Sequence, residues 1–232
     1  FYTHPHADQT HGINDLRSFF LKNKKQIPVY ADTETKKYLL STFDYCFKSS
    51  YYYPSTLKIV MLKKKHLIIN KDKKILIESI PVQHGKIKST CYLIDKKLAY
   101  VSDINFFFKK DYKRLSNLDY LIIDCFSYKN NHAHFNLDQM LEVVKILSPK
   151  KTILTNMHND LDYIQLRTKL PKNIKQGSLT TLPQAMPDYC KVSGDSIQAY
   201  KNYYINEKSY FANWKNRETP EWFNMKDTMI TC

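Results

Sequence analysis

Several features that would assign a protein to a class are absent from this sequence of 232 residues. No window holds the roughly 18 consecutive apolar residues that a membrane span requires, and the opening residues are polar and histidine-rich, unlike a signal peptide. The five cysteines are irregularly spaced without a CxxC pair, which argues against a zinc ribbon and against a disulfide framework. We therefore expect a soluble, cytoplasmic protein with reduced thiols and no membrane partner.

The sequence does have a strong excess of positive charge, +14 in total. Such a charge favours binding to nucleic acid or to anionic phosphate compounds, although a lysine-rich surface is also a common means of staying soluble. Residues 178–232 contain six basic and six acidic side chains, so residues 1–177 carry the whole excess. The chain changes character near Gly177, and we predict two domains, 1–177 and 178–232.

The pattern of apolar residues predicts an α/β fold for the first domain. Helical spacing at 13–20 and 33–47 flanks a short strand at 27–30. Short β-branched and aromatic segments then predict antiparallel strands at 67–69, 75–82, 91–94 and 98–101. Strands and helices alternate afterwards, at 120–123, 137–147, 152–154 and 161–170. A β-meander followed by βαβα units implies an α/β sandwich.

The most informative motif is the segment THPHAD at residues 3–8. Alternate residues of an extended loop lie on one side, so His4, His6 and Asp8 can present two imidazoles and a carboxylate to one divalent cation. Two histidines at this spacing also occur by chance, but the acidic residue and the helix that follows Gly12 strengthen the prediction of a metal site.

Further groups of ligand type follow predicted strands. His84 comes after the strand at 75–82, Asp103 after the strand at 98–101, and His158 after the strand at 152–154. A carboxylate such as Asp103 can also be a simple helix cap, and an isolated histidine is often only a packing residue. The coincidence of several strand-end groups is harder to dismiss than any one of them.

With these residues the sequence resembles the metallo-β-lactamase superfamily, in particular the branch of the phosphodiesterase that opens phosphoribosyl cyclic phosphate in phosphonate breakdown. The resemblance covers residues 1–177. It depends on HPHAD at 4–8 with GINDLR at 12–17, VQHG at 82–85, SD at 102–103, HAHF at 132–135, and residues 154–163. It implies an αβ/βα sandwich.

The resemblance also implies a ligand set. His4, His6 and His84 would hold one metal ion, Zn²⁺ or Mn²⁺, and Asp103 would bridge to a second ion held by Asp8 and His158. Such ions polarise a phosphate and generate a hydroxide nucleophile from water. His134 matches the family's substrate-side histidine, placed to contact the phosphate or to protonate the leaving oxygen; without the resemblance, His132 and His134 are only a loop pair.

The sequence departs from the family pattern in three places. Gln9 stands where the family has a histidine, which predicts a weaker second metal site, with one or two ions in all, or a harder ion such as Mn²⁺. His11 is a poor substitute because it lies two residues further on and is better placed to pack at the start of the helix. Only two residues precede the motif, so we expect the first strands of the fold to be lacking.

The third departure is the segment 178–232, which we cannot assign to a family. It includes a predicted helix at 196–214 with Tyr200, Tyr203, Tyr204 and Phe211 on it. These aromatic residues favour a packing face over a surface for stacking on bases.

Three hypotheses for function follow. The first is a metal-dependent phosphodiesterase acting on a small or cyclic phosphate ester. The second is a nucleic-acid processing nuclease of the same superfamily, favoured by the basic charge. The third is an incomplete, non-catalytic protein, favoured by Gln9 but opposed by the retention of the other ligand-type residues. The sequence does not specify the oligomeric state.

Overall fold

The chain divides into two units, Phe1–Gly177 and Ser178–Cys232. The computed structural model describes residues 1–177, and the helix predicted at 196–214 lies outside the described residues. Among the helices of residues 1–177, none has both the length and the apolar character needed to cross a membrane.

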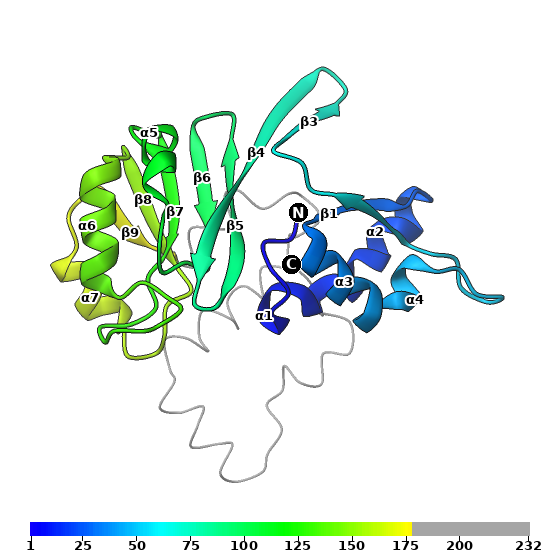
Figure 1. Cartoon of the computed structure of the whole chain (residues 1–232), viewed down its shortest axis with the longest axis horizontal. Coiled ribbons are helices and arrows are strands. Elements are labelled where there is room, and N and C mark those ends of the chain that lie inside the picture. Colours follow the sequence, from blue (N-terminus) through cyan, green and yellow to red (C-terminus); the bar gives the residue numbers. More distant parts are fainter. Residues whose placement is uncertain (178–232) are drawn as a thin grey trace, which may run out of the picture. The chain divides into compact units, whose positions relative to one another are not determined.

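The larger sheet of residues 1–177 has seven strands, in the order β3-β4-β5-β6-β7-β8-β9 (Figure 1). Strands β3 to β6 are antiparallel neighbours, whereas β6 to β9 run parallel. Asp95 and Lys96, which join β5 to β6, both have positive φ, as in the type I′ turn that matches strand twist. The strands are β3 (Lys65–Asn70), β4 (Lys73–His84), β5 (Ile87–Ile94), β6 (Leu98–Val101), β7 (Tyr120–Asp124), β8 (Lys151–Thr155) and β9 (Ile174–Gln176).

Helices connect the parallel strands of this sheet. α6 (Leu137–Leu147) begins with a capping box in which the side chains of Asn136 and Gln139 each accept a hydrogen bond from the other residue's backbone N–H. The apolar face of α6 is buried against the sheet in the main core, which includes Met140 and Leu121. The other elements of this half are η2 (Lys109–Asp111), α5 (Tyr112–Leu115) and α7 (Tyr163–Lys169).

A smaller layer is built around a parallel pair of strands, β1 (Ile27–Ala31) and β2 (Leu57–Met61). It has a core of its own, in which Ile13, Val29 and Leu39 are buried. Figure 1 shows this layer on the other side of β4 and β5 from α6 and α7. Its helices are α1 (Ala7–Thr10), η1 (His11–Asp15), α2 (Leu16–Asn23), α3 (Thr33–Thr42) and α4 (Asp44–Phe47).

The predicted α/β fold is confirmed, with a sheet flanked by helices. The predicted strands and helices occur in the predicted order, and α6 has the predicted bounds, but β2, α5 and β9 were not predicted. One difference concerns the single helix predicted at 33–47, which is divided at Phe43 because this residue leaves the helical region (φ −125°, ψ 39°). The smaller sheet of residues 1–177 consists of the pair β1-β2. That its first strands are lacking stays a prediction.

Candidate metal centre

The histidine-rich segment runs between the two layers. The backbone N–H of Tyr2 donates to the carbonyl of Tyr30 in β1 (2.9 Å), and the carbonyl of Tyr2 accepts a hydrogen bond from the hydroxyl of Tyr92 in β5. The ring of Phe1 stacks on Tyr30 and meets Tyr92 edge-on, with centroid distances of 4.2 and 5.5 Å. The chain is therefore anchored to both layers immediately before the motif begins.

His4 and His6 direct their rings toward each other, with centroids 4.5 Å apart. His4 is fully buried, and its Nδ1 lies 3.0 Å from the Thr3 hydroxyl and 3.4 Å from the Ser89 hydroxyl of β5. Its Nε2 is buried and has no hydrogen-bond partner within residues 1–177. Because an unpartnered buried nitrogen is costly, this atom is available to bind a ligand such as a metal ion.

His84 reaches the same place from the end of β4. Its Nδ1 lies 2.7 Å from the carbonyl oxygen of Ala133. Because a carbonyl only accepts, Nδ1 of the neutral ring carries the proton, and Nε2 keeps its lone pair. That Nε2 lies 3.2 Å from Nδ1 of His6. A backbone partner of this kind is typical of metal-ligating histidines, because it fixes both the tautomer and the ring orientation.

The separations between these atoms fit a metal ion. His4, His6 and His84 each offer one ligand atom, and the three atoms lie within 4.8 Å of one another. Asp103 Oδ1 lies 4.0 Å from the Nε2 atoms of both His4 and His84. Ligands bound at about 2.0–2.1 Å in a tetrahedron are roughly 3.3 Å apart, so small adjustments would allow these four residues to enclose one divalent ion.

The electrostatic environment keeps two of these histidines in the metal-binding form. Burial lowers the pKa of His4 to about 4, although the nearby Asp103 carboxylate opposes this shift. Burial also lowers the pKa of His84, against the raising effect of its hydrogen bond to Ala133. Both rings are therefore neutral at pH 7, as metal binding requires.

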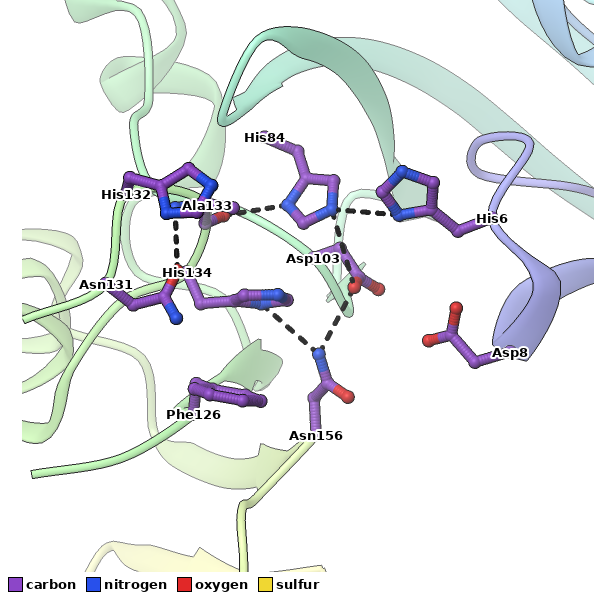
Figure 2. Close-up of a pocket in the computed structure, with 10 residues that line it drawn as sticks. All are labelled: His6, Asp8, His84, Asp103, Phe126, Asn131, His132, Ala133, His134 and Asn156. Carbon is purple, nitrogen blue, oxygen red and sulfur yellow. Dashed lines mark hydrogen bonds and ion pairs between the residues drawn. The ribbon is translucent and has the colours of Figure 1, made fainter.

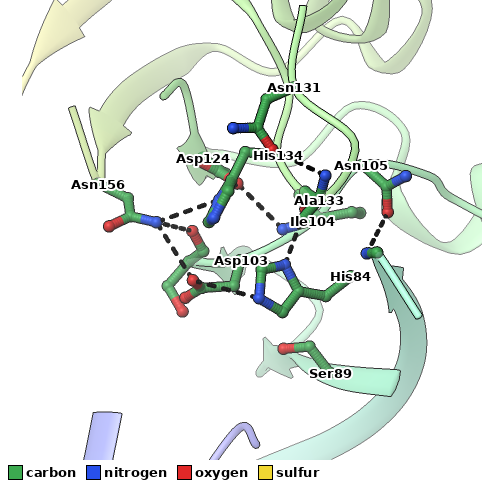
Figure 3. A network of polar contacts seen from close by, with 12 residues as sticks. His84, Ser89, Asp103, Ile104, Asn105, Asp124, Asn131, Ala133, His134 and Asn156 are labelled. Atoms are coloured by element: carbon green, nitrogen blue, oxygen red, sulfur yellow. Dashed lines mark hydrogen bonds and ion pairs between the residues drawn. The ribbon is translucent and has the colours of Figure 1, made fainter. Parts of the chain in front are cut away.

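Asp103 follows β6 and does not cap a helix, since the next helical element within residues 1–177, η2, is preceded by Phe108. Its Oδ1 accepts a hydrogen bond from the Asn156 side-chain Nδ2 (3.2 Å), and its Oδ2 is buried without a partner in the described part of the chain. Asp103 also forms a second group of ligand atoms with His84 and His134, within 4.8 Å of one another. Figure 3 shows these residues as parts of one polar network.

His134 belongs to the same network and is held by the buried carboxylate of Asp124. Its Nδ1 lies 2.7 Å from Asp124 Oδ2, an oxygen that also accepts from the backbone N–H of Ile104 (3.1 Å). The ring of Phe126 stacks on His134 at 4.6 Å. Burial lowers the pKa of His134, but the hydrogen bond and the charge of Asp124 outweigh it and raise the pKa overall. Burial raises the pKa of Asp124 to about 6, against the lowering effect of His134.

Asp8 and Gln9 are at the start of α1. Asp8 is exposed and lines the pocket, where Figure 2 shows its carboxylate on the side of His6, opposite His134. The Gln9 Nε2 donates to Asp8 Oδ2 (3.1 Å), and its Oε1 accepts from the Ser102 hydroxyl (3.5 Å). Asp8 therefore lies at the edge of the pocket but not within either group of converging ligand atoms.

His158 and His11 lie elsewhere in the structure. The side chain of His158 is 49% exposed, and its Nδ1 faces Asp160 Oδ1 at 3.2 Å. It is not among the residues that line the pocket. The ring of His11 packs edge-on against Phe43 (5.4 Å), and its Nε2 lies 3.2 Å from the Tyr38 hydroxyl, which places it with the helices of the small layer.

The converging groups surround a pocket of about 340 Å³, large enough for a small phosphate ester. Figure 2 shows the His6 and His84 rings along one side, and His134, Phe126 and Asn156 along another. The lining residues are His6, Asp8, His84, Asp103, Phe126, Asn131, His132, Ala133, His134 and Asn156.

Several residues of this site were not identified from the sequence, among them Phe126 and Asn131, which line the pocket, and two that hold the proposed functional groups. Asp124 ends the apolar strand β7, and a carboxylate in that position is a signal comparable to that of Asp103 after β6. Asn156 follows β8 with a positive φ of 59°, a conformation that asparagine tolerates better than most residues. His158 was the residue of this loop predicted to be functional, whereas Asn156 is the residue that lines the pocket.

Comparisons with known proteins agree with this geometry. A family model described as the beta-lactamase superfamily domain matches residues 1–157. A solved diphosphatase from the PhnP family is 26% identical with a TM-score of 0.66, and the alignment covers 76% of this chain and 66% of that one, just under two thirds of its length. No curated protein sequence matches the chain.

Two more distant structures share the fold. The metallo-beta-lactamase fold protein YhfI from Bacillus subtilis is 15% identical with a TM-score of 0.56, over 76% of this chain and 72% of that one. The short form of human tRNase Z is 13% identical with a TM-score of 0.54, over 77% of this chain and 75% of that one.

Proposed function

We propose that this chain, which belongs to the beta-lactamase superfamily, is a metal-dependent phosphodiesterase acting on small or cyclic phosphate esters. The observation that carries the proposal is the meeting, in one pocket, of the histidine cluster His4, His6 and His84 with a hydrogen-bonded pair, His134 and Asp124. The similarity to a diphosphatase of the PhnP family supports phosphate chemistry.

The histidine cluster would hold Zn²⁺ or Mn²⁺, with Asp103 as a further ligand. When bound, such an ion polarises the phosphate and lowers the pKa of water toward 7, which yields a nucleophile at neutral pH. The chain prepares the site by lowering the pKa of both His4 and His84, so that the rings are neutral, and by holding the proton of the His84 ring on Nδ1. The carbonyl of Ala133 holds the His84 ring in the required orientation.

In this proposal His134 acts as the general acid. Its Nδ1 proton is held by Asp124, so its Nε2 is the nitrogen that can donate to a phosphate oxygen or to the leaving group. The raised pKa of His134 keeps more of the ring protonated near neutral pH. Stacking on Phe126 fixes the plane of the ring. Asp124 serves as a positioning residue through its hydrogen bond to Nδ1.

The test uses the full chain, stripped of metal by a chelator and then reloaded with Zn²⁺ or Mn²⁺. We expect hydrolysis of bis(p-nitrophenyl) phosphate and of a 2′,3′-cyclic nucleotide only after metal is restored. His84→Ala should lose this activity, whereas His11→Ala, which changes a histidine outside the pocket, should keep it. A chain that takes up no metal, or that hydrolyses neither substrate after taking it up, would rule out the proposal.

A second candidate function, a nuclease, is favoured by the charge of one part of the surface. The hairpin β3-β4 and the segment before it expose six lysines: Lys63, Lys64, Lys65, Lys71, Lys73 and Lys74. Binding of RNA or DNA through such a surface would weaken steeply with salt, because each phosphate contact releases counterions. Cleavage of a short RNA that is faster than that of a cyclic nucleotide, and that is suppressed by salt, would favour the nuclease over the phosphodiesterase.

A further inference from the structure

Two side chains that hydrogen-bond to Asp103 and Asp8 are amides, unlike the imidazoles of the neighbouring histidine cluster. Where a two-metal centre would need further oxygen or nitrogen ligands, the side chains hydrogen-bonded to Asp103 and Asp8 are two amides, Asn156 and Gln9. His134 also has a ligand atom near Asp103, but its Nδ1 is held by Asp124. The hydrogen bonds of the two amides show which end of each amide faces the carboxylates, and therefore whether either amide is available to a cation.

The Asn156 amide turns its nitrogen toward Asp103. Its Nδ2 donates to Asp103 Oδ1 (3.2 Å) and to the backbone carbonyl of Ser102 (3.4 Å). These two partners accept only, so the opposite orientation of the amide would set oxygen against oxygen at both, which outweighs the longer contact of Nδ2 with His134 Nδ1 (3.4 Å). An amide nitrogen has no lone pair for a metal ion. Asn156 is therefore a hydrogen-bond donor to Asp103, not a companion ligand.

Gln9 is engaged in the same manner. Its Nε2 donates to Asp8 Oδ2 (3.1 Å), while its Oε1 accepts from the Ser102 hydroxyl (3.5 Å). The amide oxygen, the only atom of this side chain that a cation could use, is thus directed to a neighbouring hydroxyl. One oxygen of Asp8 is occupied as well, by a donor rather than a cation.

His158 contributes nothing to this side of the pocket. Its Nδ1 faces Asp160, and its ring packs at 5.2 Å on Phe126, which itself stacks on His134. Asp103 is left with one oxygen, Oδ2, that has no partner within residues 1–177, while Oδ1 is bonded by Asn156.

We propose that the site holds a single divalent ion, bound by His4, His6, His84 and Asp103, and that the Asn156 amide donates to the Asp103 carboxylate in place of a second ion. This inference rests on the proposed metal-dependent function. It assigns Asn156 and Gln9 the role of holding the two carboxylates by hydrogen bonds in place of a second ion.

The test measures the number of ions bound per chain. The full-length protein is stripped with a chelator and titrated with Mn²⁺, which thiols bind poorly, so that the cysteines do not add to the count. Equilibrium dialysis with elemental analysis should give one ion per chain at saturation, and none in His84→Ala. Two ions in the parent chain would overturn this inference and leave the hydrolase proposal standing, whereas none would overturn both.

A double variant sharpens the result. Gln9→His with Asn156→His replaces both amide donors by imidazoles, and we expect the ratio to rise from one ion to two. The matched control, Asn23→His, adds a histidine at an exposed helix end and should leave the ratio at one. If the double variant is folded by circular dichroism and still binds one ion, the amides are not what limits the site. If it does not fold, the count in the parent chain decides alone.

Discussion

The two sides of the pocket use the same side chain for opposite purposes. His84 and His134 lie 4.7 Å apart between ring centroids, and each is oriented through its Nδ1 atom. The partner of His84 is a neutral backbone carbonyl, and burial lowers its pKa. The partner of His134 is the Asp124 carboxylate, which raises the His134 pKa in spite of burial. The charge of the partner thus contributes to the opposite pKa shifts of the two rings, which suit the proposed roles of ligand for His84 and acid for His134.

A single loop supplies parts of both sides. Ala133 gives its carbonyl to His84, and the next residue is His134 itself. The loop is held in turn by Asn105, whose side chain donates to the carbonyl of His132 (3.0 Å) and accepts from the backbone N–H of Gly85 (2.9 Å). The proposed ligand and the proposed acid are thus positioned by one loop. A change at the ligand should alter the metal content, whereas a change at the acid should alter the pH dependence.

The largest effect should come from the histidine cluster. His84→Ala removes one of the converging nitrogens and the contact with Ala133, so we expect loss of bound metal and a fall in kcat/KM of roughly 10³-fold or more. Elemental analysis and steady-state kinetics on the same sample measure both quantities. His66→Ala, in strand β3, is the control for removing a histidine and should retain metal. Full activity in a metal-free His84→Ala chain would disprove the role of the cluster.

A smaller loss of activity, without loss of bound metal, should follow from a change at His134, on the other side of the pocket. His134→Ala removes the proposed acid, for which we expect a decrease in kcat of about 10²-fold, the lower end of the usual range for general acid catalysis. Metal content should equal that of the parent chain. The decrease should shrink for a substrate with a good leaving group such as p-nitrophenolate, which needs little protonation. An equal decrease for good and poor leaving groups would argue against the acid role.

Asp124→Asn should change the pH dependence more than the rate. The carboxylate raises the pKa of His134 against the effect of burial, so its removal lets this pKa fall. Because an acid acts only while protonated, the alkaline limb of the kcat/KM profile should move to lower pH, with a decrease at pH 7 of about 10-fold. A uniformly reduced profile with an unmoved alkaline limb would mean that Asp124 is only structural.

Much of the fold could be predicted from the sequence because local patterns determine it. The apolar spacing of α6 gave its bounds, and the short β-branched and aromatic runs gave the strands β3 to β8 of the large sheet, whereas β9 was not predicted. The break at Phe43 could not be predicted, because helical spacing continues through it and only the packing of the small layer shows the change in backbone.

The candidate site was predictable where the residue type carries the signal. The three converging histidines were identified from the spacing of His4 and His6, from the position of His84 after a strand, and from the resemblance to a family. Their role as ligands stays a prediction. Asp124 and Asn156 were missed because their importance depends on partners distant in sequence, His134 and Asp103. The orientation of the His158 side chain could not be predicted either. A side chain on a loop can point toward the pocket or, as here, toward Asp160.

The smallest effect should come from the backbone that joins the two sides. Gly85 has a φ of +57°, and a Cβ atom built there would lie 3.1 Å from the Cβ of Ala133. Gly85→Ala should therefore cost about 1–2 kcal/mol of stability and lower Tm by a few degrees. Because the displaced Ala133 holds His84 and precedes His134, we expect a few-fold fall in kcat/KM as well. Gly12→Ala, whose nearest neighbour is 4.0 Å away, is the matched control and should be nearly neutral. Destabilisation by Gly85→Ala with unchanged activity would show that the two sides are not coupled through this loop.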